Sequence, residues 1–403
     1  MSSGPKPKLR VSFVVPRYGL EIIGGAENAT RMLAEALVAQ NSAQVEILTT
    51  TAMAIDTWAN AYPASNEVLN GVTVKRFAVT SGRTPNFSQA TKRTLASPRS
   101  QSVGEATEFI RLQGPVSDGL TNAVELCESD ALVFYPYLYH PTVEGILRGR
   151  LPTIMHPAAH QEPVLDLPIF ESVFQKVSAV VYHTEAERDL IESHFQVAHK
   201  PSLDLGMGFR QFNGIPGDIV TRLGLSKDRY LLCLGRVDAP KGTTLLVNMF
   251  NEFKNRNESD LKLVLAGPVS ILPNVVDDVL VLGPISEADK AALLSGAIAL
   301  ISPSAFESFS IVLIEAWSYR KPVLVNAACL PTVEQARNSG GGLIFSGYES
   351  FEVAIRRIQS DPSLNTFLGN AGYNYVMSRY QWPQLIERYT KFIQKVVDNH
   401  SKS

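Results

Sequence analysis

The amino-acid sequence predicts an α/β protein with two doubly wound domains, and two observations support this fold class. The chain has 403 residues, of which 45% are hydrophobic. At roughly 150 residues per domain, a chain of this length is expected to form two to three domains with large cores. Short apolar runs of strand length also alternate with longer stretches of helical periodicity. This alternation is typical of repeated βα units in a parallel sheet.

The first series of βα units predicts one Rossmann-like domain. Its expected strands are at 11–15, 45–48, 131–135, 153–155 and 179–182. The stretch 26–39 is expected to be a helix, because Ala29, Leu33 and Leu37 share one face and charged residues lie on the other. Helices are expected to fill much of the remaining sequence between these strands.

The segment 80–104 interrupts the first series. It is polar, basic and poor in large apolar residues, so it predicts a mobile surface loop. A disordered insertion and a loop that grips substrate are both consistent with this composition. Its basic residues are Arg83, Lys92, Arg93 and Arg99.

A second series of βα units follows a glycine-rich stretch at 205–217, which is expected to be a hinge. Its expected strands are at 230–234, 262–266, 279–282, 298–302 and 322–326, with helices at about 242–255, 286–295, 311–319 and 332–338. Two further helices, near 363–378 and 382–397, end the chain. The predicted domains are 1–204 and 205–381. Loops at the strand ends of both domains are expected to face one central cleft.

Composition and missing motifs exclude several classes of function. A net charge of -2 argues against a nucleic-acid partner. Three widely spaced cysteines form neither a disulfide framework nor a thiolate zinc site, which favours a reducing compartment. The polar first ten residues lack the apolar core of a signal peptide, and the longest apolar stretch is shorter than the ~20 residues of a membrane span. A cytoplasmic location is expected, with at most peripheral membrane contact.

The loop after the first strand contains neither a dinucleotide fingerprint nor a P-loop. No nucleophile elbow, HExxH motif or DxD motif occurs in the chain. We therefore expect no cofactor and no metal.

Two glycine-containing loops are candidate phosphate sites. Gly24 and Gly25 precede a predicted helix, where residues without Cβ let an anion approach the free N–H groups. An ordinary flexible βα loop explains the same pair. Arg236 and Lys241 flank a predicted strand end, and together they suit the diphosphate of a nucleotide. A solvated turn with two surface cations is the alternative.

Two carboxylates mark a third candidate. Glu307 is expected in the loop after a strand, and Glu315 in the following helix, so that both can face one ligand. An ionised Glu315 in this apolar helix requires hydrogen-bond donors, and ribose hydroxyls would supply them. Alternatively, the Glu315 side chain points to solvent. Ser308 and Ser310 lie near the helix start, where N–H groups can face an anion or a sugar.

In order and spacing, these segments resemble the retaining glycosyltransferases of family 4, which have the GT-B fold. The most specific matches are the sequence from Gly235 to Gly242 and the sequence from Glu307 to Glu315. The resemblance covers nearly the whole chain. It implies that the terminal helix, about 382–403, returns to the N-terminal domain, which binds the acceptor, while the C-terminal domain binds a nucleotide-sugar. Ser308 and Ser310 depart from the family, because glycine is frequent at both positions.

The resemblance implies a role for each matched residue. Arg236 and Lys241 would hold the diphosphate in place of a metal. Glu307 would contact the sugar, helped by the backbone N–H groups of Phe309 and Ser310, and Glu315 would bind the ribose. The remaining matches are Gly24 and Gly25 near the phosphates, His156 on the transferred sugar, and main-chain groups around Gly283 and Ile285 on the base. His140 and His160 compete with His156 for its role, because they also lie near predicted strand ends.

The implied activity is metal-independent transfer of a hexose, with retention by front-face substitution, from a nucleotide-sugar to a saccharide or lipid-linked saccharide, as in polysaccharide biosynthesis. A UDP-sugar is the favoured donor and GDP-mannose the second. The tyrosine-rich run 135–140 is expected either to offer aromatic faces to the acceptor or to complete a core edge. The alternative functions are a non-catalytic partner subunit of this fold, a nucleotide-sugar epimerase and a phosphorylase.

Overall fold

A computed structural model describes residues 8–22, 24–270 and 277–402 and divides the chain into two compact units. The first unit comprises the chain up to Gly208 together with Trp382–Ser403, and the second comprises Phe209–Gln381. The division after Gly208 falls within the predicted hinge. The terminal helix belongs to the first unit. Most of the polar first ten residues lie outside the described part of the chain.

The first unit is built on an eight-stranded sheet with the order β3-β4-β2-β1-β5-β6-β7-β8. Its strands are β1 (Arg10–Val14), β2 (Gln44–Thr50), β3 (Asn66–Leu69), β4 (Val72–Phe77), β5 (Ala131–Phe134), β6 (Thr153–Met155), β7 (Ala179–Tyr182) and β8 (Ser202–Asp204). All neighbours are parallel except β3 and β4. The central strand β5 is buried at every position, as expected of a parallel sheet covered on both faces.

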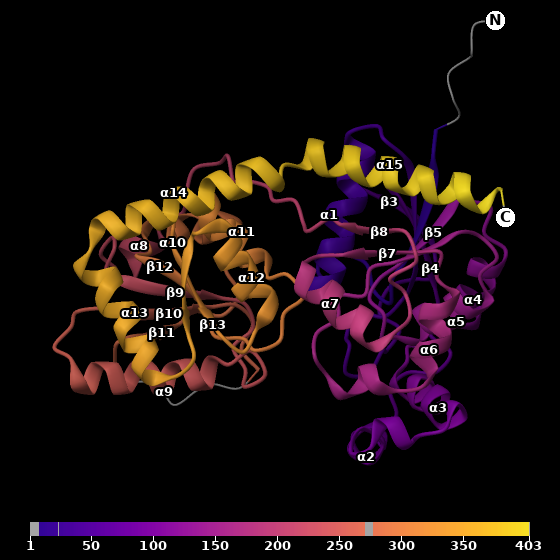
Figure 1. Ribbon diagram of the computed structural model, residues 1–403, viewed down its shortest axis with the longest axis horizontal. Coiled ribbons are helices and arrows are strands. Elements are labelled where there is room, and N and C mark those ends of the chain that lie inside the picture. Colours follow the sequence, from indigo (N-terminus) through magenta and orange to yellow (C-terminus); the bar gives the residue numbers. More distant parts are fainter. Residues whose placement is uncertain (1–7, 23, 271–276, 403) are drawn as a thin grey trace, which may run out of the picture. The chain divides into compact units, whose positions relative to one another are not determined.

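Helices cover both faces of this sheet. They are α1 (Gly25–Ala39), α2 (Phe87–Leu95), α3 (Val103–Gln113), α4 (Asp118–Glu125), α5 (His140–Arg148), α6 (Ile169–Lys176), α7 (Glu185–His194) and α15 (Trp382–His400), with 3-10 turns at Pro98–Ser100 and Pro163–Asp166. Helix α1 buries Ala29, Leu33 and Leu37, the face expected from its periodicity. Helix α15, drawn in yellow, packs beside α1 within this unit (Figure 1).

The prediction of a loop over 80–104 is wrong, because this segment contains α2 and a 3-10 turn. Phe87 of α2 packs against Phe109 of α3, and the Arg83 guanidinium lies 4.6 Å from the centre of the Phe87 ring. Ser102 begins α3 with a capping box, which fixes the end of the segment. A few apolar contacts are therefore enough to order this segment. The polar composition of the segment does not reveal them, so it predicted a loop.

The antiparallel hairpin of β3 and β4 was not predicted, although the sequence contains its turn. Asn70 and Gly71 both have positive φ, at 50° and 83°. An Asn-Gly pair in this conformation forms the two-residue turn that matches the twist of a hairpin.

The second unit contains a six-stranded parallel sheet with the order β11-β10-β9-β12-β13-β14. Its strands are β9 (Tyr230–Leu234), β10 (Lys262–Ala266), β11 (Val279–Val281), β12 (Ala299–Ser302), β13 (Val323–Asn326) and β14 (Gly342–Phe345). Its helices are α8 (Ile219–Arg222), α9 (Thr243–Arg256), α10 (Glu287–Gly296), α11 (Ile311–Ser318), α12 (Leu330–Ser339), α13 (Tyr348–Ser360) and α14 (Pro362–Arg379). This strand order is that of a doubly wound dinucleotide-binding sheet.

Candidate functional site

The strand order of the second unit reverses between β9 and β12. In open α/β sheets, ligands bind outside the carboxyl ends of the strands at such a switch point. Strand β9 ends at Leu234, shortly before Arg236, and β12 ends at Ser302, shortly before Glu307. The residues predicted from the two motifs therefore follow the two strands that flank the switch point.

Lys241 and Glu307 form an ion pair in which Lys241 Nζ lies 2.7 Å from Glu307 Oε1. Both side chains are half-buried. Gly242 makes this approach feasible because its φ is +75°, and a Cβ atom there would lie 2.6 Å from the carbonyl oxygen of Pro303. The glycine thus allows the loop after β9 to pack directly on the loop after β12.

Asp238, which the sequence does not mark as a site residue, contacts Arg236 and the backbone of Lys241. One oxygen, Oδ1, accepts the backbone N–H of Lys241 at 2.8 Å, and Oδ2 lies 3.5 Å from Arg236 Nε. Asp238 is buried, whereas the Arg236 side chain is 52% exposed. Within the described part of the chain, no carboxylate pairs with the terminal Nη atoms of Arg236. This guanidinium therefore presents its terminal donors to solvent.

Glu315 has a cationic partner that the sequence does not predict. Lys290 Nζ of α10 lies 2.7 Å from Glu315 Oε1 and 2.9 Å from Glu287 Oε2. The side chain of Glu315 is only 20% exposed, so the alternative that it points to solvent is wrong. Burial raises the pKa of Glu315, and Lys290 opposes this shift. No periodicity links residues on different helices, so the sequence carried no sign of this pair.

The start of α11 explains why glycine is frequent at one position of the family motif. Ser310 is the N-cap of the helix and has a φ of 67°, in the left-handed region. Phe309 is buried against Tyr380, with ring centroids 5.4 Å apart, and its carbonyl accepts a hydrogen bond from Gln335. The predicted binding by the N–H groups of Phe309 and Ser310 stays a prediction.

Gly283 and Ile285 lie in the loop after β11. The carbonyl of Gly283 accepts the N–H of Gly267 at 2.8 Å, and Ile285 is half-buried. This hydrogen bond ties the loop to the carboxyl end of β10. The expected contact with a nucleotide base stays a prediction.

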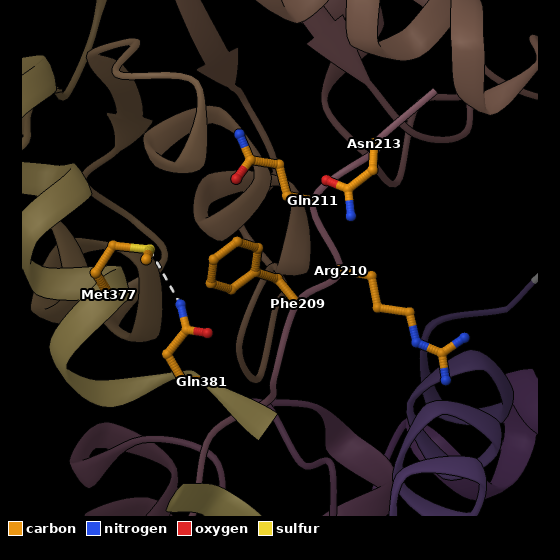
Figure 2. Close-up of a pocket in the computed structure, with 6 residues that line it drawn as sticks. All are labelled: Phe209, Arg210, Gln211, Asn213, Met377 and Gln381. Carbon is orange, nitrogen blue, oxygen red and sulfur yellow. Dashed lines mark hydrogen bonds between the residues drawn. The ribbon is translucent and has the colours of Figure 1, made fainter. Parts of the chain in front are cut away.

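A separate pocket of about 380 Å³ lies in the second unit, at the two segments where it meets the rest of the chain (Figure 2). Its lining consists of Phe209, Arg210, Gln211, Asn213, Met377 and Gln381. The Phe209 ring lies toward Met377 and Gln381, whereas the Arg210 side chain points away from both (Figure 2). Gln381 Nε2 donates a hydrogen bond to Met377 Sδ at 3.0 Å. The predicted site residues are not among those that line this pocket.

In the first unit, the N-terminus of α1 already holds a carboxylate. A Cβ atom on Gly24 would lie 2.2 Å from Glu27 Oε2, and Arg17 Nε donates to Glu27 Oε1 at 2.9 Å. A side chain at Gly24 would therefore displace the Glu27 carboxylate from its present position. Gly25 has open space around it. Phosphate binding by this pair stays a prediction.

His156 follows β6 and is fully buried. Its Nε2 atom lies 2.8 Å from the hydroxyl of Tyr389 in α15, and its ring stacks on Tyr135. Burial, together with His183, lowers the pKa of His156, so the imidazole is neutral. His156 thus has no exposed surface in this structure. Its contact with the transferred sugar stays a prediction.

The two histidines that compete with His156 lie elsewhere in the same unit. His140 is the first residue of α5, and His160 Nδ1 lies 3.7 Å from Glu162 Oε1. Neither is fully buried as His156 is. Only His156 of the three joins the cluster around Tyr389.

The tyrosine-rich run after β5 completes a core edge. Tyr135, Tyr137 and Tyr139 are all buried. Tyr135 hydrogen-bonds His183, and the Tyr137 hydroxyl donates to Glu162 Oε1 at 2.9 Å. Their rings contact the protein interior, so the interpretation that these faces bind a sugar acceptor is wrong.

Two further properties concern only the described residues. Among residues 8–22, 24–270 and 277–402, no three histidine, cysteine or acidic side chains are grouped so that they could hold a metal ion. In the same ranges, no helix combines the length and apolar character needed to cross a bilayer.

Comparison with solved structures identifies the fold. The chain superposes on a sucrose-phosphate synthase from Thermosynechococcus elongatus with a TM-score of 0.72 and 16% identity, covering 97% of this chain and all of the other. It also superposes on Anabaena HepE in complex with UDP and glucose, with a TM-score of 0.67, 14% identity, and 96% and 100% coverage. The fold is therefore that of the GT-B glycosyltransferases, as the resemblance implied.

Sequence comparison then gives the family of the second unit. Residues 219–375 match the family described as Glycosyl transferases group 1, so the chain carries a domain of that family. An alpha-maltose-1-phosphate synthase of Mycobacterium tuberculosis is 24% identical over 209 residues, covering 45% of this chain and 51% of the synthase. An alpha-D-kanosaminyltransferase of Streptomyces kanamyceticus is 25% identical over 263 residues, covering 59% and 67%. The chain thus matches about half the length of the synthase.

Proposed function

We propose that this protein is a retaining glycosyltransferase that transfers a hexose from a nucleotide-sugar to a saccharide or lipid-linked saccharide. The observation that carries the proposal is the grouping of Arg236, Lys241 and Glu307 at the switch point of the second unit. Two cations at this place suit a diphosphate, and a carboxylate beside them suits sugar hydroxyls. The group 1 domain over residues 219–375 supports the same activity.

Arg236 and Lys241 would stabilise the leaving diphosphate. The exposed terminal donors of Arg236 can form two parallel hydrogen bonds to phosphate oxygens. Lys241 gives one of its three N–H donors to Glu307, and its half-exposed ammonium keeps others for phosphate. In this proposal both charges would lie where negative charge develops as the sugar–phosphate bond breaks.

The proposed reaction is a front-face substitution. A bond forms between the acceptor oxygen and the anomeric carbon while the bond from that carbon to the phosphate oxygen breaks. The acceptor proton passes to the departing phosphate oxygen, so atoms and charges balance. Attack from the face that the phosphate leaves retains the anomeric configuration. In this proposal the first unit binds the acceptor. The enzyme acts in the cytoplasm, and transfer requires no metal ion.

A UDP-sugar is the proposed donor, with GDP-mannose second. The HepE structure that shares this fold is in complex with UDP and glucose. A panel of nucleotide-sugars should be screened by thermal shift and by slow donor hydrolysis, with and without EDTA. The true donor will raise the melting temperature, because a ligand that binds only the folded state stabilises it. Arg236→Ala should abolish this shift, and EDTA should leave it unchanged.

Product analysis tests the stereochemistry and the alternatives. NMR of the glycoside should show the anomeric configuration of the donor, and an inverted linkage would contradict the proposed mechanism. Donor binding without turnover would favour a non-catalytic partner subunit. Conversion of the nucleotide-sugar into its epimer without an acceptor, or phosphorolysis of a saccharide, would replace transfer by one of the other activities.

A further inference from the structure

The ion pair between Lys290 and Glu315 has a geometry that leaves half of the carboxylate available. Lys290 contacts Oε1, and within the described part of the chain no donor is hydrogen-bonded to Oε2. The Glu315 side chain retains 20% exposure, so an approaching ligand can reach it. Helix α11 is largely apolar, and its residues Leu313, Ile314, Ala316 and Trp317 are buried.

A carboxylate in such surroundings is costly to ionise unless a cation lies beside it. Lys290 is that cation, and it comes from α10 rather than from the helix that carries Glu315. The other titratable groups around this carboxylate are Glu287 and Tyr319. Neither carries a positive charge, so among the residues that the structure describes it is Lys290 that offsets the charge of Glu315.

We infer that Lys290 is a positioning residue for nucleotide binding: it holds Glu315 by Oε1 and directs Oε2 at the hydroxyls of the ribose. This inference rests on the proposed function, because it requires a nucleotide donor at the switch point. Lys290 itself contacts no ligand in this arrangement. Its removal therefore acts on ribose recognition and leaves the diphosphate contacts of Arg236 and Lys241 intact.

The effect of Lys290 on ribose recognition can be separated from its effect on stability by comparing nucleotides with and without ribose hydroxyls. Binding of UDP and of 2′,3′-dideoxy-UDP, and of the corresponding guanosine pair, should be measured by calorimetry. The ratio of the two dissociation constants reports only on the ribose hydroxyls. Wild-type protein should prefer the ribonucleotide by about tenfold, the value of one hydrogen bond to a charged group. Lys290→Met should bring the ratio to about one.

Two control variants test whether a change in this ratio comes from the loss of the charge at Lys290. Lys254→Met removes a lysine of similar exposure that is paired with Asp278 at 2.7 Å, on α9, and it should keep the wild-type ratio. Lys290→Arg keeps the positive charge and should retain most of the discrimination. It serves as the test variant if Lys290→Met folds poorly.

Burial raises the pKa of Glu315 against the opposing charge of Lys290. Without that charge, binding of the ribonucleotide by Lys290→Met should recover as the pH rises, because a larger fraction of the carboxylate then ionises.

The outcomes separate the inference from the function on which it rests. If Lys290→Met folds and keeps tenfold discrimination, Lys290 does not position Glu315, while the proposed donor binding stands. If the wild-type protein binds the ribonucleotide and its dideoxy form equally, Glu315 does not read the ribose, and the inference is overturned. If wild type binds no nucleoside diphosphate, the proposed function and the inference fail together.

Discussion

Two clusters of polar groups, one in each unit, are stabilised in opposite ways. In the second unit, Glu307 and Glu315 each face a lysine ammonium at 2.7 Å and retain some exposure. In the first unit, His156, His183 and Tyr389 lie in the interior, where burial lowers the pKa of His183 to about 4 and raises that of Tyr389. One cluster keeps its charges by pairing, and the other is kept neutral by burial. Partly buried charges stay ionised when a counterion lies beside them, and the cluster of the second unit combines such pairing with an open side.

The neutral cluster of the first unit also fixes the backbone around it. Glu187 accepts the N–H groups of Ala159 and His183 at 2.8 and 2.7 Å. Burial raises the pKa of Glu187 to about 8. These hydrogen bonds hold the loop after β6, which carries His156, against α7. The polar groups of this cluster therefore serve the fold first.

The largest expected effect tests the charged cluster. Lys241→Ala should lower kcat for glycosyl transfer by about a thousandfold, because one donor to the developing negative charge is lost. Glu307 is part-exposed, so its loss of a partner should change the free energy of unfolding by less than about 1 kcal/mol. Steady-state kinetics and urea denaturation measure the two quantities. Full activity in Lys241→Ala would remove the basis of the contrast between the two units.

Gly242→Ala should disturb the same cluster through the backbone. A side chain at this left-handed position, 2.6 Å from the Pro303 carbonyl, should destabilise the second unit by about 3 kcal/mol. Hydrogen exchange of the amides of α9 will report the loss. Gly224→Ala is the matched control, because Gly224 also has a positive φ but has no atom within 4 Å of an added Cβ. Equal effects of the two substitutions would show that strain alone, and not the contact between loops, matters.

The neutral cluster predicts a pH effect. The pKa of His183 is about 4 in the folded protein and near 6.5 when unfolded, so between these values the unfolded state binds the extra proton. Stability from this group is therefore lost as the pH falls. Between pH 7 and pH 5, wild type should lose about 2 kcal/mol more than His183→Gln, measured by urea denaturation. A constant difference between the two proteins would show that His183 is not held neutral by burial.

The smallest expected effect concerns the segment 80–104, for which the sequence wrongly predicted a loop. Ser102→Ala removes the N-cap side chain and should cost about 1 kcal/mol. Limited proteolysis should then cut more readily near 96–104, whereas Ser88→Ala, at an exposed position of α2, should behave as wild type. No change in Ser102→Ala would mean that the packing of Phe87 on Phe109 alone orders the segment.

The sequence predicted the βα series because each buried parallel strand must be a short apolar run, as Tyr230–Leu234 is. It also predicted the motif residues Arg236, Lys241 and Glu307, because they follow strand ends at fixed spacing. It missed β14 and failed over 80–104, where a few contacts between distant residues decide the structure. The tyrosines after β5 allowed two interpretations until their burial was known.

The sequence by itself thus determined the two doubly wound domains and the candidate motifs, since local periodicity and chain order carry both. Only the tertiary structure decided which charges meet. Lys241 and Glu307 are 66 positions apart, and Lys290 and Glu315 are 25 positions apart on different helices. The strand order brings these pairs together, and an ion pair depends on distance in space, which no local pattern encodes.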